Sequence, residues 1–402
     1  MNEQEIEEYI RENDIQFIRL TFFDVFGEQR NIAIMPEQLK RAMKEGIPFD
    51  ASAIPGFYSD ENCDLFLEPD TSTMSIVPWR SLDGGVVRIL CDITHPDGSP
   101  FTLDTRHMLK EAVKQAHSQG IDVEVGTEVE FYIFKTDENG EPTRIPHDNA
   151  GYFSVAPKDK GENIRRSICQ MLRQMGIVPE ASHHEKGPGQ HEVDFRAGNP
   201  LQTADNTTTF RWIVENAIEL SGCHADFSPK PLRDKPGNGM HIGISSDSTD
   251  DTIKYFMAGV MDHIREMTLF LNPGVNSYER LGTLEAPGYI SWSKKSRLQL
   301  IRIPAQRSEI KRFELRSPDP LANPYLAYTL VILAGLDGVK KKSRLSDPVD
   351  FDLHNANADM IAKLGRLPVH LEEAIRCARE SDFLKESIPQ KIIDEYCNNR
   401  YV

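Results

Sequence analysis

One short stretch, residues 125–134, constrains the fold more than any other part of the chain. Its β-branched and aromatic side chains favour an extended strand. Residues two apart on a strand project to the same face, so Glu128 and Glu130 point one way and the apolar side chains beside them point the other. Two neighbouring carboxylates are costly to bury without a cation. The stretch is therefore either a solvated sheet face or one wall of a cation site.

The composition of the chain narrows the class of protein. Its 402 residues are enough for one large domain and a smaller one. Hydrophobic residues make up 39% of it, and no apolar run approaches the ~20 residues that a membrane helix needs. The net charge of −16 argues against a nucleic-acid surface, which requires clustered Lys and Arg. We therefore expect neither a membrane nor a nucleic acid as partner.

Two further features indicate a cytoplasmic protein. Residues 1–5 have neither the basic start nor the apolar core of a signal peptide. The cysteines are scattered along the chain without a Cys-x-x-Cys pair. This spacing suits reduced thiols better than a disulfide framework or a zinc site. We therefore expect a cytoplasmic location.

Residues 1–100 predict a small domain of mixed strands and helices. The elements expected are a helix over 3–13, a hairpin of strands over 15–22 and 29–34, a helix over 36–44, a loop over 48–57, and strands near 73–76 and 86–92. The turn-rich residues 94–100 mark its boundary with a second domain.

Residues 101–402 predict a larger domain. The elements expected are helices over 104–119, 161–175 and 208–222, strands over 125–134 and 296–304, a polar loop over 135–150, a hairpin over 180–195, a glycine-rich loop and strand over 229–245, an alternating strand over 311–316, an apolar helix over 325–338, and a short helix within 389–397.

The hairpin offers two further carboxylates. Histidine–glutamate pairs stand on either side of a Gly-Pro-Gly turn at residues 187–189. Two strands folded back at this turn would bring Glu185 close to Glu192. A solvated hairpin is the alternative interpretation.

Two other stretches carry charged or ligating side chains. His241 follows the glycine-rich loop, and a lone histidine in a strand is more often structural than a ligand. In the alternating strand, Arg312, Glu314 and Arg316 share one face. Arginines flanking a carboxylate suit a site where anions meet a metal, but a surface ladder of ion pairs is the alternative.

A series of motifs, taken in order, resembles the type I bacterial glutamine synthetases over nearly the whole chain. The motifs are Phe-Asp-Ala-Ser at 49–52, Gly-Thr-Glu-Val-Glu-Phe at 126–131, His-His-Glu at 183–185 with Gly-Gln-His-Glu at 189–192, Asn-Gly-Met-His at 238–241, Asn-Ser-Tyr-Glu-Arg-Leu at 276–281, and Arg-Phe-Glu-Leu-Arg at 312–316. The resemblance implies an α+β fold. It also implies a β-grasp-like N-terminal domain over 1–100 and a catalytic domain over 101–402, with a curved antiparallel sheet backed by helices.

The same resemblance implies a reaction. ATP would activate the side-chain carboxylate of glutamate as an acyl phosphate. Ammonia, formed when ammonium loses a proton, would then attack the acyl phosphate to give glutamine and release phosphate. The resemblance implies two or more Mg²⁺ or Mn²⁺ ions, since magnesium prefers carboxylate oxygens and manganese also accepts imidazole. It further implies a homo-oligomer, a hexameric ring or a dodecamer of two rings, with each active site between neighbouring subunits.

The resemblance also implies roles for individual residues. One metal would take Glu130, Glu185 and Glu192, and the second Glu128, His241 and Glu314. The catalytic residues would be Asp50, Glu285 and Arg297. The substrate would contact Glu130, Tyr152, Gly237, His241, Arg280 and Arg316. The nucleotide would contact Glu180, Arg297, Arg302 and Arg312.

Several positions depart from the family pattern. Pro236 stands where an asparagine contacts glutamate, Ala53 replaces a serine beside Asp50, and Gly243 replaces a polar residue of the nucleotide site. The sequence also ends at Val402, short of the helix that joins the two rings, so we expect a hexameric ring with weaker stacking.

These departures leave two alternatives to a glutamine-forming enzyme. One is a relative that joins glutamate, or a similar acid, to an organic amine. The other is a non-catalytic homologue that acts as a regulator or scaffold. The full set of metal-ligand positions argues against the second, because an idle site has no reason to hold so much unpaired negative charge.

Overall fold

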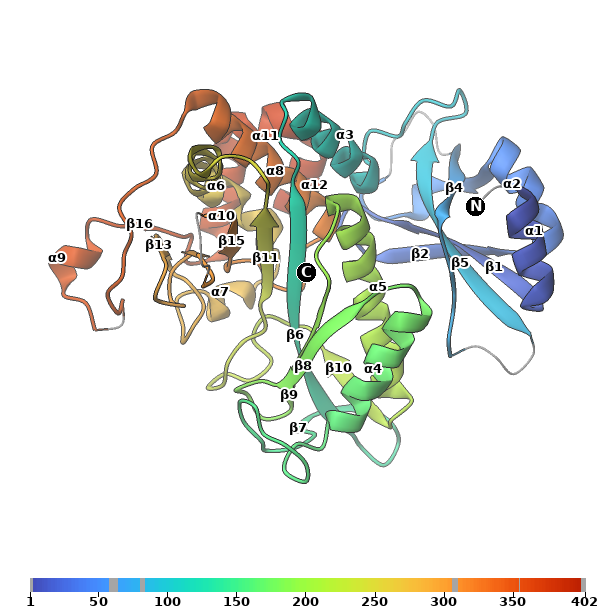
Figure 1. The fold of residues 1–402 in the computed structure, drawn as a ribbon, viewed down its shortest axis with the longest axis horizontal. Helices are drawn as coiled ribbons and strands as arrows, with labels where there is room; N and C mark the ends of the chain where they lie inside the picture. Colours follow the sequence, from blue (N-terminus) through green and yellow to red (C-terminus); the bar gives the residue numbers. More distant parts are fainter. Residues whose placement is uncertain (1–2, 58–63, 80–83, 306–309, 354, 399–402) are drawn as a thin grey trace.

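The computed structural model describes residues 3–57, 64–79, 84–305, 310–353 and 355–398 (Figure 1). Figure 1 shows a blue N-terminal sheet on one side, the long strand β6 (Glu124–Thr136) through the middle, and the orange and red C-terminal helices on the other side. The expected α+β fold, with a separate N-terminal sheet, is confirmed. Among the described helices, none combines the length and the apolar character that would cross a membrane.

The N-terminal domain is built on a five-stranded sheet of order β2-β1-β5-β4-β3. Its elements are α1 (Glu3–Glu12), β1 (Ile15–Phe23), β2 (Gln29–Ile34), the 3₁₀ helix η1 (Pro36–Gln38), α2 (Leu39–Glu45), β3 (Ile47–Asp50), the 3₁₀ helix η2 (Ala51–Ala53), β4 (Asp64–Ile76) and β5 (Gly85–Thr94). The expected hairpin of β1 and β2 is confirmed, with Ile18 opposite Ile34.

The prediction of a loop over residues 48–57 was wrong at its start. Residues 47–50 form β3, which pairs with β4 and places Phe49 opposite Leu65. The Phe49 ring packs against Phe22 with 4.9 Å between ring centroids. Tertiary pairing and this aromatic contact overrode the weak local propensity of a segment that begins with proline.

The second domain is built on a sheet of order β13-β14-β15-β11-β6-β9-β8, with β10 and β7 also paired to β6. Its strands are β6, β7 (Pro142–Pro146), β8 (Pro179–His184), β9 (Gln190–Phe195), β10 (Cys223–Asp226), β11 (Met240–Ser245), β13 (Trp292–Ser293), β14 (Ile301–Arg302) and β15 (Arg312–Leu315). A separate small pair joins β12 (Tyr289–Ile290) to β16 (Gly365–Arg366).

Helices complete this domain. They are α3 (Thr105–Ser118), α4 (Glu162–Gln174), α5 (Pro200–Glu219), α6 (Asp250–Leu271), α7 (Ser277–Arg280), α8 (Pro324–Lys341), α9 (Ala358–Ile361), α10 (Leu371–Glu380), α11 (Asp382–Ser387) and α12 (Gln390–Asn398). Helices α6 and α8 approach closely, since a Cβ on Gly259 would lie 2.2 Å from the carbonyl oxygen of Ala334. The expected apolar helix and the short C-terminal helix are confirmed as α8 and α12.

Three other predictions in this domain need correction. The strand expected over 296–304 is confined to β14, because residues 296–298 turn and the Arg297 carbonyl accepts a hydrogen bond from the Arg316 side chain at 3.0 Å. The loop expected over 135–150 contains β7, which pairs with β6. Helix α5 begins at Pro200 rather than 208, because the Asn199 side chain caps it by accepting from the Leu201 amide.

The two domains share one buried ion-pair network. The Arg106 side chain of α3 is almost wholly inaccessible and contacts carboxylates of Asp70 at 2.8 Å, Asp92 at 2.7 Å and Asp205 at 2.9 Å. Asp70 and Asp92 belong to the N-terminal sheet, and Asp205 belongs to α5. The guanidinium therefore joins the two domains through charge-assisted hydrogen bonds.

Candidate active site

The alternation in β6 places two glutamates on the open face of the large sheet. Val125, Val129 and Phe131 are buried in the core, whereas Glu128 and Glu130 remain partly exposed on the other face. This pattern follows the period of two that the sequence predicts. The open face is the floor of the site.

The hairpin of β8 and β9 brings a third and a fourth carboxylate to this floor. The strands pair antiparallel, and the turn between them contains Gly189 with φ of 68°. A Cβ there would lie 2.8 Å from the carbonyl oxygen of Ile133, so the position requires glycine. Glu192 in β9 lies opposite Glu130 in β6, as the expected hairpin requires.

The first group of candidate metal ligands comprises His183, Glu185 and Glu192, whose ligating atoms lie within 4.8 Å of one another. Burial raises the pKa of Glu185 to about 7, and the charge of Glu130 adds to the effect. Burial likewise raises the pKa of Glu192 well above its usual value. Crowded carboxylates of this kind favour a bound cation.

The resemblance implies Glu130 as a ligand of the first metal, but the compact group of ligating atoms does not include it. Its Oε2 accepts a hydrogen bond of 2.7 Å from the Gly239 amide, and His183 stands in the compact group instead. His183 contacts the carboxylates of Glu185 and Glu192 at 3.5 Å each. Sequence reasoning gave His183 no ligand role, although it is the first residue of the His-His-Glu motif at 183–185.

The second group comprises Glu128, His241 and Glu314, the set that the resemblance implies. Register places His241 of β11 opposite Glu128 of β6. The Nδ1 atom of His241 lies 3.4 Å from the Glu128 carboxylate and 3.6 Å from that of Glu314. Burial would raise the pKa of Glu128, but the hydrogen bond and charge of His241 outweigh it and lower the pKa to about 2.

Arginines surround the second group. Arg302 lies 2.8 Å from the Glu314 carboxylate, which also forms an ion pair with Arg316. Arg280 is buried and donates to the carbonyl oxygens of Ser317 at 2.7 Å and Arg316 at 3.1 Å. Burial lowers the pKa of the Arg280 guanidinium. An anion in the adjacent cavity would therefore be stabilised by these cations.

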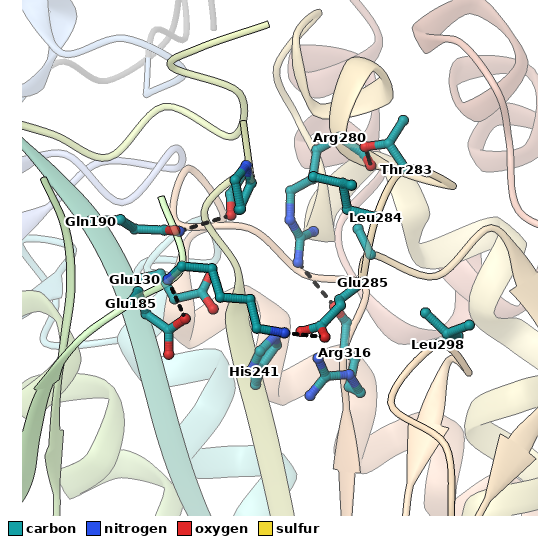
Figure 2. Close-up of a pocket in the computed structure, with 14 residues that line it drawn as sticks. Glu130, Glu185, Gln190, His241, Arg280, Thr283, Leu284, Glu285, Leu298 and Arg316 are labelled. Carbon is teal, nitrogen blue, oxygen red and sulfur yellow. Dashed lines mark hydrogen bonds and ion pairs between the residues drawn. The ribbon is translucent and has the colours of Figure 1, made fainter. Parts of the chain in front are cut away.

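Three cavities meet at His241, which lines all of them. The central cavity, of about 380 Å³, is lined by Gly237, Arg280 and Leu298 among others (Figure 2). The second, of about 340 Å³, is lined by Tyr152 and Arg297 together with the first carboxylate group. The third, of about 260 Å³, is lined by Glu180, Gly243 and Arg312.

Within one chain, Asp50 lies apart from these cavities. It ends β3 of the N-terminal domain and is exposed, and its carboxylate accepts from the Ser52 amide at 2.8 Å. It lines none of the three cavities that meet at His241. The other predicted site residues all lie in or beside these cavities.

Sequence reasoning also missed Lys186, which forms an ion pair with Glu285. Both residues line the central and the second cavity. Figure 2 shows Glu285 on the side of the central cavity that faces Glu130 and Glu185. The sequence signal that could have identified Lys186 is its position directly after Glu185, in the turn that carries the Glu185 carboxylate to the site.

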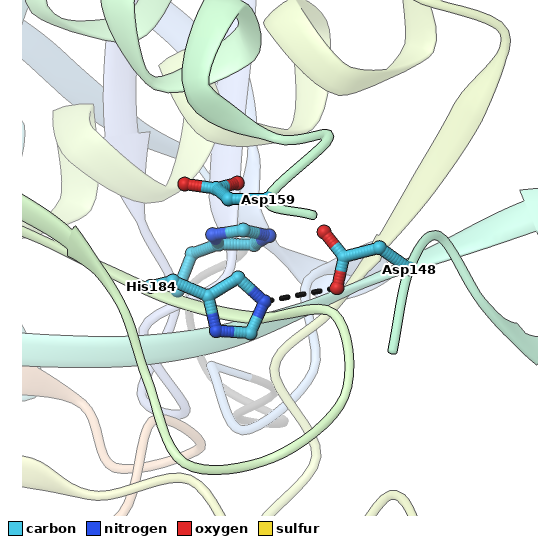
Figure 3. Close-up of side chains that lie close together, drawn as sticks. Asp148, Asp159 and His184 are labelled. Atoms are coloured by element: carbon cyan, nitrogen blue, oxygen red, sulfur yellow. Dashed lines mark hydrogen bonds and ion pairs between the residues drawn. The ribbon is translucent and has the colours of Figure 1, made fainter. Parts of the chain in front are cut away.

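A buried network supports the hairpin from behind (Figure 3). Nε2 of His184 lies 2.9 Å from Asp148, and Nδ1 lies 2.6 Å from the carbonyl oxygen of Glu185. Both neighbours are acceptors, so these contacts favour the ring with both nitrogens protonated. Burial would lower the pKa of His184, but these hydrogen bonds outweigh it and raise the pKa.

The same network contains a second ion pair. Arg165 contacts the Asp159 carboxylate at 2.7 Å and Nδ1 of His191 at 2.8 Å. Although Asp148, Asp159, His184 and His191 lie within metal-ligand distance of one another, the guanidinium already supplies the cation. We interpret the network as support for the β8–β9 hairpin.

Comparisons with known proteins match this architecture. The family model described as "Glutamine synthetase, catalytic domain" covers residues 102–402, and "Glutamine synthetase, beta-Grasp domain" covers residues 14–96. A glutamine synthetase of Methanosarcina mazei is 42% identical over 98% of this chain and 92% of its own length. One from Clostridium saccharobutylicum is 40% identical over 98% and 93%.

Solved structures agree. A structure named "GmaS/ADP complex-Conformation 1" superposes with a TM-score of 0.87 at 25% identity, covering 98% of this chain and 94% of that one. An electron cryomicroscopy structure of Plasmodium falciparum glutamine synthetase has the same fold, with a TM-score of 0.86 at 24% identity and coverage of 99% and 94%. The chain belongs to the glutamine synthetase family and is a ligase.

Proposed function

We propose that this protein forms glutamine from glutamate and ammonium, at the expense of ATP, through γ-glutamyl phosphate. One observation supports the proposal above all. Two groups of candidate metal ligands, one of which contains His241, lie beside an arginine-lined cavity in a chain that matches both domains of the family. A site for phosphoryl transfer requires this combination of cations and metal ligands.

Two divalent ions, Mg²⁺ or Mn²⁺, fit the residues present. Glu128, His241 and Glu314 would hold one, and Glu185 and Glu192, with Glu130 or His183, would hold the other. The shifted pKa values of the first carboxylate group support this, because a cation would relieve their mutual repulsion. When bound, the ions would neutralise and orient phosphate oxygens.

The central cavity is the proposed site for glutamate. Arg280 and Arg316 supply positive charge for its carboxylates, and Gly237 allows close approach of the backbone. The carboxylate of Glu130 would contact the substrate from the floor of the central cavity, and the ring of Tyr152 would contact it from the adjoining second cavity. The backbone carbonyl oxygen of Pro236 already has a hydrogen-bond partner, since it accepts from the Tyr132 hydroxyl at 2.7 Å.

The third cavity is the proposed site for the nucleotide. Glu180 and Arg312 line it, and Arg302 approaches from Glu314. Gly243 adds room, since a Cβ there would meet only the carbonyl oxygen of Gly126, at 3.5 Å. The phosphates would lie toward His241, where Arg297 can approach from the second cavity. Arginines placed around the transferred group stabilise its charge.

We further propose that the site is completed by a neighbouring copy of the chain. Asp50 is exposed and lines none of the three cavities of its own chain, so a second subunit would have to supply it. Its carboxylate would bind ammonium and accept its proton, while Glu285 would close the site. A homo-oligomer, as a hexameric ring or a dodecamer, provides such shared sites.

The proposed location is the cytoplasm. The described cysteines, Cys91, Cys169, Cys223, Cys377 and Cys397, are free thiols, whereas Cys63 lies outside the described residues. Reduced thiols suit a reducing compartment.

The first experiment identifies the nitrogen donor. Purified protein is incubated with ATP, Mg²⁺ and glutamate, with ammonium or with a panel of primary amines, and ADP and amide product are measured together. Ammonium-dependent ADP release with equal glutamine formation is expected. Turnover with an organic amine but not with ammonium would favour the amine ligase, and no turnover with either would favour the non-catalytic homologue.

A further inference from the structure

The Lys186 side chain reaches across the site and places its charge between two groups that attract cations. Its Nζ forms an ion pair with the Glu285 carboxylate. The same nitrogen lies 5.7 Å from the centre of the Tyr152 ring, within the range of a cation–π contact. We call the space between Glu285 and Tyr152 the cation position.

The cation position lies where the central cavity and the second cavity adjoin. Lys186, Glu285 and Glu185 line both the central cavity and the second cavity. The surrounding charge is negative on the side of the β8–β9 hairpin, where Glu185 and Glu192 are crowded. A carboxylate, an aromatic face and further carboxylates nearby are the features that bind a small ammonium group.

The ion pair is poorly suited to a stabilising role. The side chains of Lys186 and Glu285 are 41% and 43% exposed. Exposed pairs contribute little to folding stability, because solvent screens them and holding two long side chains costs entropy. Partial burial would raise the pKa of Glu285, but the Lys186 hydrogen bond and charge outweigh it and lower the pKa. The carboxylate is therefore charged and held by a partner that another cation can replace.

We propose that Lys186 controls the affinity of the site for its nitrogen donor, because its own ammonium group occupies the cation position. An incoming ammonium or primary alkylammonium ion would displace Nζ from Glu285, and the lysine would turn toward solvent. No covalent bond forms or breaks in this exchange. This inference rests on the proposed function and adds a residue that determines affinity for the donor.

The proposal predicts a gain of affinity when the charge is removed. Lys186→Met keeps most of the side-chain stem and removes the ammonium group, which leaves Glu285 available to the substrate. The KM for ammonium should fall by about two- to fivefold, the range that corresponds to an exposed ion pair. The KM values for glutamate and ATP should stay within about twofold. Damage to the fold cannot produce this result, since damage would weaken binding.

The experiment compares four full-length proteins: the wild type, Lys186→Met, Lys186→Arg and the control Lys114→Met. Lys114 forms an exposed pair with Glu111 on α3, so its loss changes net charge equally without touching the site. Initial rates are measured against ammonium chloride at saturating glutamate, ATP and Mg²⁺, with sodium chloride holding ionic strength constant. Lys186→Gln replaces Lys186→Met if the latter does not fold.

The outcomes separate this inference from the proposed function. A lower KM for ammonium in Lys186→Met, with values near the wild type in Lys186→Arg and Lys114→Met, supports it. An unchanged or higher KM in Lys186→Met, or an equal fall in Lys186→Arg, overturns it while the proposed function stands. A wild type that shows no ammonium-dependent turnover contradicts the proposed function and removes the donor on which the inference depends.

Discussion

Glu192 and Glu130 lie directly opposite each other in the antiparallel register of β9 and β6. They come from segments that are distant in sequence, and both face the open side of the sheet. The pairing therefore brings two carboxylates close together. Burial and the nearby carboxylates raise the pKa of Glu192 well above its usual value, which shows that its negative charge is poorly stabilised there. Such an arrangement binds a cation more readily than it stabilises the free protein.

The first prediction tests this with Glu192→Gln. The variant should lose ATP-dependent turnover, because a hard cation loses a carboxylate ligand. In the absence of metal its melting temperature should equal or exceed that of the wild type, since repulsion is relieved. The rise in melting temperature that Mg²⁺ gives the wild type should largely disappear.

The matched control is Glu219→Gln, an exposed carboxylate near the end of α5. It should keep both turnover and the response to Mg²⁺. If Glu192→Gln retains wild-type turnover at low Mg²⁺ concentration, Glu192 is not a ligand. Glu130→Ala is expected to behave like Glu192→Gln in the turnover assay.

The second prediction concerns a site shared between subunits. Asp50→Ala and Glu130→Ala should each be inactive as separate proteins. After the two are mixed and subunit exchange is verified with labelled chains, some interfaces would combine an intact Asp50 with an intact Glu130. Partial recovery of activity is therefore expected. Mixtures that exchange subunits and yet stay inactive would show that Asp50 acts within its own chain or not at all.

Local sequence patterns predicted part of this site well. The alternation of apolar and acidic residues in β6 and the Gly-Pro-Gly turn at 187–189 were sufficient to predict a strand and a hairpin that carry carboxylates. These features depend on side-chain periodicity and turn chemistry, which are local properties. By contrast, the pairing of His241 with Glu128 depends on the register of β11 against β6, which no local pattern specifies.

The residues that were missed depend on contacts between distant segments. Lys186 meets Glu285 only because the β8–β9 turn faces the loop after α7. Residues 47–50 have weak strand propensity alone and become the strand β3 through pairing with β4, so the local sequence predicts a loop there. Helix α6 was not predicted at all, although Thr249 caps it and two aspartates begin it.

The third prediction concerns the network behind the hairpin. Asp148 accepts hydrogen bonds from the His184 ring at 2.9 Å, the Gly189 amide at 3.2 Å and the Lys160 amide at 2.9 Å. Asp148→Asn removes the negative partner that favours the protonated His184 ring and should destabilise the protein by about 3 kcal/mol. Because the network positions Glu185, apparent affinity for Mg²⁺ should also fall about 10- to 100-fold.

The control for Asp148 is Asp137→Asn. Asp137 also accepts backbone amides in a turn, from Asn139 at 2.8 Å and Glu141 at 2.9 Å, but it is exposed. Its substitution should change stability by less than about 0.5 kcal/mol. Thermal unfolding and Mg²⁺ titration of both variants provide the comparison. Equal Mg²⁺ affinity in Asp148→Asn and the wild type would contradict a positioning role.

The fourth prediction concerns pH and the helices behind the sheet. His263 of α6 lies 2.8 Å from Asp337 of α8 and 3.4 Å from Glu266, and its ring stacks on Phe383 at 4.0 Å. Burial would lower the pKa of His263, but hydrogen bonds to the two carboxylates outweigh it and raise the pKa above its ordinary value. Lys341 also pairs with Asp337 and competes for this carboxylate.

Because the pKa of His263 is raised in the folded state, the direction of the pH dependence of stability follows. The protonated histidine contributes stability that is fully present below pH ~6.5 and is lost as pH rises through the folded-state pKa. His263→Asn should therefore cost about 1.5 kcal/mol at pH 6 and less at pH 9, because the stability that the protonated ring contributes decreases as the pH rises. Denaturation of both proteins at the two pH values measures the difference. A cost that is equal at pH 6 and pH 9 would show that His263 acts through packing on Phe383 rather than through its charge.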